Sequence, residues 1–283
     1  MTSGFGNRLG FTLVEALVSM LLSSLIVILV STTFLIQNEF YSDAVKRSAL
    51  QESVRGAVSL VSTELRGVAA GGIVSAEADS VRYRFPLVMG GVCAVNGTET
   101  YLYFPLDGEG VVGSEVSGYA VRDSAGVWTH VPATWTSVYQ SSGVGPAQVC
   151  AQAGADTVGI QTDFYRLDNL SATPAIQAGD LVMIYAERIL RLDTSALDGS
   201  STAIFWGPAG GDLTEFSDGL TPESAFQYKT SNSSTLRDRL TGGNLDRIVL
   251  VRFSAFGAAP ASRANRDSLT FDLAVSVPLG NAY

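Results

Sequence analysis

Histidine and cysteine are scarce in this chain of 283 residues, and their scarcity excludes several kinds of active site. His130 is the only histidine, and the two cysteines, Cys93 and Cys150, do not form a C-x-x-C pair, so a zinc site lacks ligands. The chain also lacks the G-x-S-x-G and G-x-x-x-x-G-K-[ST] sequences that mark hydrolase triads and phosphate-binding P-loops. We therefore expect no enzyme activity, no cofactor and no metal, and a structural role for His130 in a strand.

Positive charge is also in short supply. The formal net charge is -9, so the chain should repel nucleic acid and anionic lipid headgroups, and we expect no nucleic-acid partner. The negative charge does not form a recognisable calcium loop either, because no D-x-[DN]-x-[DN]-G spacing is present. Several acidic residues lie in loop-like sequence: Asp193, Asp198, Asp212, Glu215, Asp218 and Glu223. The simpler interpretation is that these loops are solvated, and the alternative is that calcium orders them.

Proline is absent from the first 85 residues, and the first proline in the chain is Pro86. Without a helix breaker, residues 11–66 predict one continuous helix about 84 Å long, ended by glycines from Gly67 onwards. The second part of this helix has an apolar stripe, which we expect to pack against the domain that follows. The stripe consists of Leu50, Val54, Ala57, Val58, Val61 and Leu65, whereas Lys46, Arg47, Glu52, Arg55 and Glu64 are predicted to face elsewhere.

The first part of the helix is a nearly uninterrupted apolar run, residues 11–36, with Glu15 as its only charge. The run is too long for a cleaved secretory signal and is not followed by a small-x-small cleavage site. A plain signal anchor fits the length, and Arg8 would keep its N-terminal end cytoplasmic. Neither alternative explains Glu15, since a charge inside a membrane helix costs about 2.5–3.5 kcal/mol.

After residue 72 the pattern changes to the period of two that is typical of half-buried strands. Strands are predicted around residues 81–85 and over residues 101–106, 119–122, 127–131, 158–166, 181–190, 247–256 and 268–277, with a hairpin turn at Asn96-Gly97. Residues 190–245 predict long loops with one short helix near residues 233–240. The expected fold class is α+β, a long N-terminal transmembrane and amphipathic helix packed on a mainly antiparallel β-sheet domain.

The sequence Gly10-Phe11-Thr12-Leu13-Val14-Glu15 resembles the processing site of type IV pilins and pseudopilins. The resemblance implies that a prepilin peptidase and N-methyltransferase cuts between Gly10 and Phe11 and methylates the new Phe11 amine. It implies that Glu15 is the counter-ion of a neighbouring subunit's N-terminus during assembly. The domains are then a leader at residues 1–10, a helix at residues 11–70 that spans the membrane over residues 11–36, and a β-rich domain at residues 71–283.

The position of the first proline indicates which members of this family the chain resembles. Many major pilins have a proline some twenty residues into the mature helix, but this chain has Ser31-Thr32-Thr33 there. Segments such as residues 180–185, 249–253 and 269–272 also resemble W-type minor pilins and J-type pseudopilins. We therefore expect a minor pilin or pseudopilin of a type IV pilus or type II secretion pseudopilus, with other pilins or pseudopilins and an inner-membrane assembly platform as partners. Two alternatives remain. A tip adhesin or ligand-binding module on the same helix would be favoured by exposed aromatic side chains in residues 190–245, and a membrane-anchored enzyme would need a polar pocket around His130 or the acidic loops.

This function carries expectations for location and for the cysteines. The precursor would be a single-pass inner-membrane protein with a periplasmic globular domain, which later joins the pilus or pseudopilus. If that domain is exported, Cys93 and Cys150 should form one disulfide, because exported proteins meet oxidising conditions. Two buried free thiols are the alternative.

Overall fold

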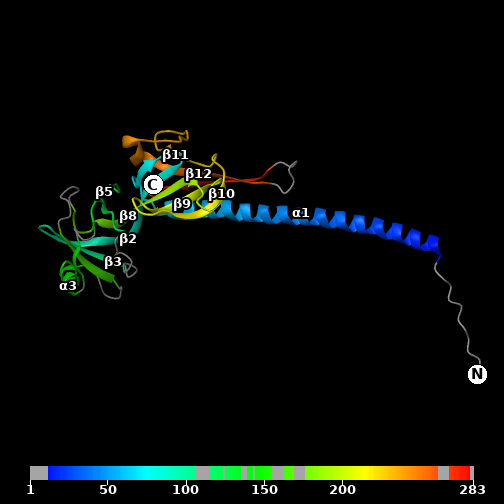
Figure 1. Cartoon of the computed structure of the whole chain (residues 1–283). Coiled ribbons are helices and arrows are strands. Elements are labelled where there is room, and N and C mark those ends of the chain that lie inside the picture. Colours follow the sequence, from blue (N-terminus) through cyan, green and yellow to red (C-terminus); the bar gives the residue numbers. More distant parts are fainter. Residues whose placement is uncertain are drawn as a thin grey trace, which may run out of the picture. The chain divides into compact units, whose positions relative to one another are not determined.

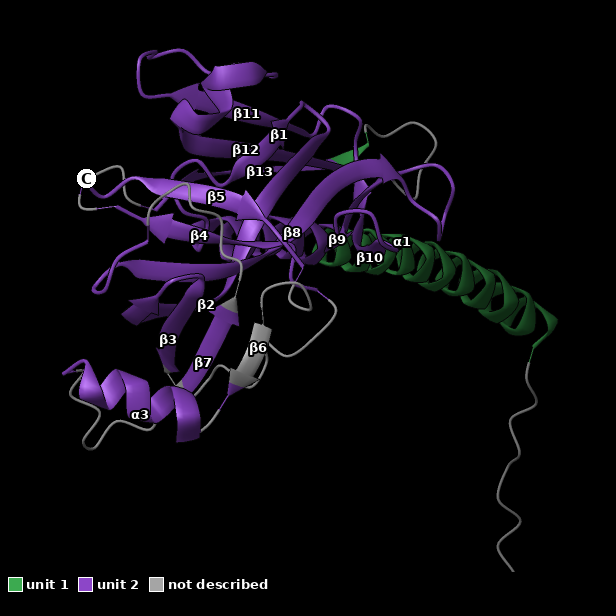
Figure 2. Cartoon of the chain, turned by 90° about the vertical axis from the view of Figure 1, so that its left-hand side faces the viewer, with its two compact units in different colours: residues 1–49, 259–269 green, residues 50–258, 270–283 purple. Residues whose placement is uncertain are grey.

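A computed structural model of the chain describes residues 12–105, 115–123, 125–134, 139–142, 144–154, 162–168, 176–260 and 268–280. The predicted leader, including Gly10, and the predicted new N-terminus Phe11 lie outside these residues. The chain divides into two compact units, residues 1–49 with 259–269 and residues 50–258 with 270–283 (Figure 2).

Helix α1, Leu13–Arg66, is continuous, as the absence of proline predicts (Figure 1). Thr12 precedes it as the N-cap residue, and the first helical hydrogen bond runs from the Ala16 N–H to the Thr12 carbonyl over 3.2 Å. The helix ends one residue before Gly67. Residues 13–49 of the helix belong to the first unit, and residues 50–66 belong to the second.

The remainder is predominantly β-structure, which confirms the α+β class. The described strands are β1 (Ile73–Ala76), β2 (Ser80–Asn96), β3 (Glu99–Pro105), β4 (Gly118–Arg122), β5 (Trp128–Pro132), β6 (Tyr139–Ser142), β7 (Thr162–Asp168), β8 (Leu181–Thr194), β9 (Thr202–Pro208), β10 (Thr214–Leu220), β11 (Ala225–Thr230), β12 (Ile248–Ala259) and β13 (Leu269–Pro278). A helix, α3 (Val144–Gln152), and a 3₁₀ helix, η2 (Gly242–Arg247), interrupt them.

The thirteen described strands form one sheet whose strand pairs with a defined register are all antiparallel. Its main order is β11-β12-β10-β9-β8-β2-β3-β7-β6, with β1 on β2, β13 on β12, and β4 between β8 and β5. The hairpin predicted at Asn96-Gly97 joins β2 to β3, where Asn96 pairs with Glu99 and Gly97 has a φ of 66° that suits glycine. The long strands β2 and β8 lie in the middle of this order and pair with each other along residues 80–91 of β2.

The prediction for residues 190–245 is wrong in two respects. This segment contains the paired strands β9, β10 and β11 instead of long loops, and no helix forms over residues 233–240. All three strands are short, and β9 and β10 also contain Gly, Pro, Asp or Ser. Their stability therefore comes from pairing with other strands and not from local pattern. Helix α3, with Gly145 and Pro146 in its first turn, was not predicted either.

Within the second unit, residues 50–66 of α1 pack on the sheet through a buried face. Its members are Leu50, Val54, Ala57, Val61, Glu64 and Leu65. Strand β12 comes so close that a Cβ on Gly257 would lie 2.7 Å from side-chain carbons of Leu50 and Val54, so only glycine fits there. After β13, the Gly280 N–H donates to the Val68 carbonyl and the Ala70 N–H donates to the Gly280 carbonyl, each over 2.9 Å.

Candidate functional site

The N-terminus of α1 holds Glu15 in a local arrangement with Thr12. The Thr12 hydroxyl accepts a hydrogen bond from the Glu15 N–H over 3.3 Å and donates one to the Glu15 carboxylate over 3.4 Å. A hydroxyl at the N-cap followed three residues later by Glu is the pattern of a capping box, and a carboxylate there also interacts favourably with the helix dipole. Our sequence reasoning missed this role for Thr12, although the T-x-x-E spacing was visible.

The first part of α1 presents apolar side chains on every side. Its 18-residue window of highest mean hydropathy, at 2.6, has none of its residues buried, and the helix is long and apolar enough to cross a membrane. A helix that is apolar all round needs a lipid or protein environment. Beyond the predicted span, the exposed aromatic residues Phe40 and Tyr41 continue this surface. A hydrophobic surface of this kind is suited to a bilayer or to other apolar helices.

Glu64 corrects the expected orientation of one charged residue. It lies on the buried face of α1, 8 % exposed, where the Tyr83 hydroxyl donates to its carboxylate over 2.7 Å and Arg188 forms an ion pair over 3.3 Å. The Arg188 guanidinium also lies over the ring of Phe85, 4.1 Å from its centre. Burial, followed by the Glu64 carboxylate, raises the pKa of Tyr83 well above its usual range. This network joins α1 to strands β2 and β8.

A pocket of about 670 Å³ lies beside His130. Its lining includes Arg84, Trp128 and Asp246, and the ring of His130 packs edge-on against Tyr185 with 5.6 Å between ring centres. The His130 Nε2 is buried without a hydrogen-bond partner. In the described part of the chain no group of three His, Cys, Asp or Glu residues could hold a metal ion. The ring packs against Tyr185, but it also lines the pocket and its Nε2 has no partner, so the structural role of His130 and the absence of catalysis both stay predictions.

The environment of His130 makes folding stability depend on pH. Burial, and to a lesser extent the positive charge of Arg84, lowers the pKa of His130 to about 4. In the unfolded chain the histidine pKa is about 6.5, so between pH 4 and pH 6.5 the unfolded chain binds more protons than the folded chain does. We expect the free energy of unfolding to fall by up to about 3 kcal/mol as pH drops from 6.5 towards 4, with no contribution from His130 above 6.5.

Urea titrations of the detergent-solubilised wild type and of His130→Gln across this window measure the effect. The wild type should lose the extra stability, and the variant should show a shallower dependence on pH that leaves only the carboxylate contribution. Equal slopes in the two proteins would contradict the prediction.

The acidic residues between 190 and 245 serve local structure. Asp198 accepts hydrogen bonds from the Ser200 and Ser201 N–H groups over 2.8 and 2.9 Å, and these bonds lower the pKa of its carboxyl. Glu215 accepts from the Ser195 hydroxyl and the Ala196 N–H over 2.6 and 2.9 Å. The Asp198 contacts stabilise a turn, those of Glu215 join β10 to the segment after β8, and calcium binding stays untested.

The adhesin alternative called for an exposed aromatic patch in the same segment. Among residues 190–245, all of which are described, only Leu197 and Phe216 are large apolar side chains with more than a third of their surface exposed. Phe216 lies near the helix, since a Cβ on Gly56 would be 3.7 Å from its ring. One exposed aromatic side chain does not make a patch, so this segment gives the alternative no support.

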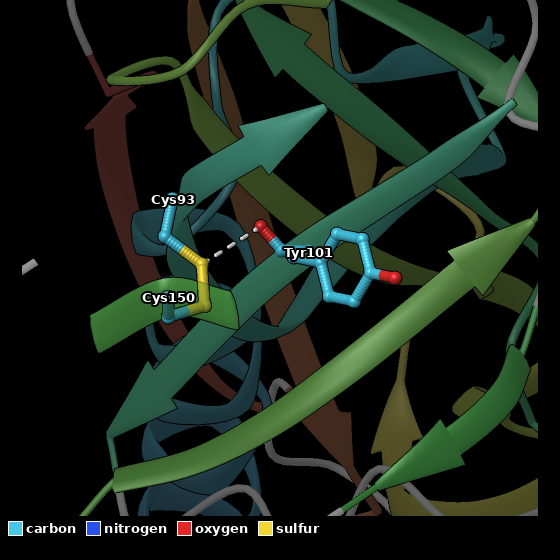
Figure 3. Close-up of a disulfide and its surroundings, with 3 residues drawn as sticks. All are labelled: Cys93, Tyr101 and Cys150. Carbon is cyan, nitrogen blue, oxygen red and sulfur yellow. Dashed lines mark hydrogen bonds between the residues drawn. A yellow bond between two sulfur atoms is a disulfide. The ribbon is translucent and has the colours of Figure 1, made fainter. Parts of the chain in front are cut away.

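A disulfide joins Cys93 of β2 to Cys150 of α3, with 5.2 Å between the two Cα atoms (Figure 3). Cys93 Sγ lies 3.2 Å from the Tyr101 carbonyl oxygen, but a disulfide sulfur has no proton, so this contact is a hydrogen bond only when the thiol is reduced. The bridge is surrounded by the packed side chains of Tyr101, Val149 and Phe164. The bridge therefore fixes α3 over one end of the sheet face formed by β2, β3 and β7.

Comparison of the chain with protein-family models, with curated proteins and with solved structures found no match. The functional argument therefore rests on the residues and geometry described above.

Proposed function

We propose that this chain is a minor pilin or pseudopilin, a subunit that enters a fibre through its N-terminal helix. The observation that carries the proposal is α1 itself, an unbroken helix whose first part is apolar all round and whose first turn contains a carboxylate. A soluble protein would cover such a surface, and a plain membrane anchor would gain only a helix cap from Glu15. A bundle of like helices uses both, because each helix covers its neighbours and each carboxylate neutralises a neighbouring ammonium group.

The resemblance of residues 10–15 to a prepilin processing site suggests an order of events. Before assembly α1 would hold the chain in the inner membrane with the sheet domain in the periplasm, and processing after Gly10 would create the Phe11 amine. Pairing of that amine with the Glu15 carboxylate of a neighbouring subunit would then fix the position of the new subunit's helix along the helices already in the fibre. The absence of proline before Pro86 supports a minor subunit, because the helix has no built-in site for melting.

The mass of the mature N-terminal peptide tests the proposal directly. Chain isolated from the membranes of a host with an active prepilin peptidase should begin with Phe11 carrying one methyl group on its amine. Replacing Gly10 by glutamate should prevent cleavage and leave the leader in place, because a long charged side chain at the cleavage site should keep a peptidase from the backbone. Wild-type chain that retains its first ten residues in such a host would rule the proposal out.

A further inference from the structure

Strand β13 is an unprotected edge of the sheet. In the described part of the chain it pairs only with β12, at the end of the sheet next to residues 50–66 of α1. Natural edge strands are usually blocked by lysine, by proline, by a bulge or by a covering segment. The ten residues of β13 contain no lysine, a single charged residue, Asp272, and a proline only at the last position, Pro278. Its backbone is therefore available to pair with a further strand.

A groove of about 500 Å³ lies between this edge and α1. The helix side of the groove is one face, because its residues follow one another at steps of three and four: Arg55, Val58, Ser59, Ser62, Thr63 and Arg66. The strand side consists of Leu273 and Val275, whose half-buried side chains alternate with exposed ones along β13. A strand added beside β13 would direct every second side chain into this α1–β13 groove.

The groove has a positive charge at each end. Within the described residues neither Arg55 nor Arg66 has a carboxylate at ion-pair distance. The Arg66 guanidinium donates to the Ser62 hydroxyl over 3.2 Å, and that of Arg55 lies 5.9 Å from the ring centre of Phe271. Both side chains are exposed, and their position at the two ends of the groove distinguishes them from the other described arginines without an ion pair. They complement carboxylates that come from outside the unit.

The spacing of the two arginines limits the ligand. They are eleven residues apart on the helix, which is three turns and about 16 Å. Carboxylates four residues apart on the same face of a strand are about 14 Å apart at about 3.4 Å per residue, and the long arginine side chains can reach across the remaining difference. We propose that the α1–β13 groove binds an extended acidic segment of another polypeptide, which adds to β13 as a strand and places its carboxylates on Arg55 and Arg66.

This mode of binding is β-strand addition, in which backbone hydrogen bonds supply affinity and side-chain pockets supply specificity. Here the small hydroxyl side chains of Ser59 and Thr63 leave room for an apolar side chain between the two charged ends. The inference goes beyond the proposed function and does not depend on it, since any acidic strand outside the membrane qualifies.

Two fluorescent peptides test the inference against the full chain in non-ionic detergent, with fluorescence anisotropy as the measurement. One has the core Glu-Thr-Val-Thr-Glu flanked by Ser and Thr, and the other has Lys in place of each Glu. The acidic peptide should bind saturably below about 1 mM, and the lysine peptide should not. In the double variant Arg55→Glu with Arg66→Glu, the acidic peptide should bind at least about tenfold more weakly and the lysine peptide should bind instead.

A matched control separates the groove from net charge. Arg47→Glu with Arg237→Glu makes the same change in charge at two exposed arginines outside the groove, and should leave binding of the acidic peptide within about twofold, because salt screens distant charges. Ser59→Trp fills the groove without changing charge and should abolish binding, whereas Ser59→Ala should not. Near-UV circular dichroism verifies that each variant is folded. Absence of saturable binding to the wild type, or equal loss in the two double variants, overturns the inference.

Discussion

Replacing Glu15 by alanine is expected to remove the chain from fibres while leaving its membrane insertion and its processing intact. In the assembled helix bundle the methylated Phe11 amine of a neighbour would face no counter-charge in apolar surroundings. Removing one partner of a buried ion pair costs about 3–5 kcal/mol, and each 1.4 kcal/mol is a factor of ten in equilibrium. The amount of chain in the isolated fibre fraction, relative to the membrane fraction, should therefore fall at least about tenfold, as measured by quantitative immunoblotting.

Glu15→Gln distinguishes this role from the local one. Glutamine serves a capping box as well as glutamate does, so a purely local function with Thr12 would survive the substitution. A counter-ion cannot be replaced by a neutral amide, and so Gln should fail as completely as Ala. Glu52→Gln, which removes the same charge from an exposed position of the same helix, is the control and should have no effect. Normal incorporation of the Glu15→Gln chain would refute the counter-ion role.

Replacing Arg188 by methionine should lower the free energy of unfolding by about 3 kcal/mol, because it leaves the Glu64 carboxylate buried without its cation. Methionine retains much of the apolar contact that the arginine makes with Phe85 and Trp206, so the loss reports mainly on charge. Denaturant titration, followed by tryptophan fluorescence, measures the change. At low temperature, where the variant domain remains folded, the amount of chain in the fibre fraction should equal that of the wild type.

Two further variants complete this test. Arg191→Met removes an arginine from the same strand, but one that is 45 % exposed and paired with Asp193 over 2.9 Å, and should cost less than about 1 kcal/mol. Adding Glu64→Gln to Arg188→Met should restore part of the stability, because no uncompensated charge then remains buried. If the Arg188 and Arg191 variants lost equal stability, Glu64 would not depend on its cation.

Local pattern was sufficient for α1 and for the longer strands. The helix could be predicted because its apolar stripe repeats at the helical period and nothing before Gly67 breaks it. Strands such as β2 and β8 have the composition and length of a buried sheet. In these segments local preference and tertiary structure agree, so the sequence alone is informative.

Apart from the local Thr12 cap, the main features that escaped prediction depend on distant partners. Glu64 was placed on the outer face because it is charged, and its burial is favourable only because Arg188 and Tyr83, both distant in sequence, pair with it. Strand β10 is mostly polar, and it is stabilised by pairing with β9 and by Ser217, whose hydroxyl donates to the Ser53 carbonyl over 2.8 Å. The α1–β13 groove likewise exists only because the last strand packs beside the first helix, a contact that no local pattern indicates.

The hydrogen bonds that Gly280 makes with Val68 and Ala70 bring the two ends of the sheet domain together, and this has a consequence for the timing of folding. Contacts between residues so distant in sequence form slowly, because the whole intervening chain must be closed into a loop first. During synthesis α1 leaves the ribosome long before β13 exists. Its apolar face at Leu50, Val54 and Val61 therefore waits uncovered, and a holding chaperone outside the membrane should speed maturation of this chain.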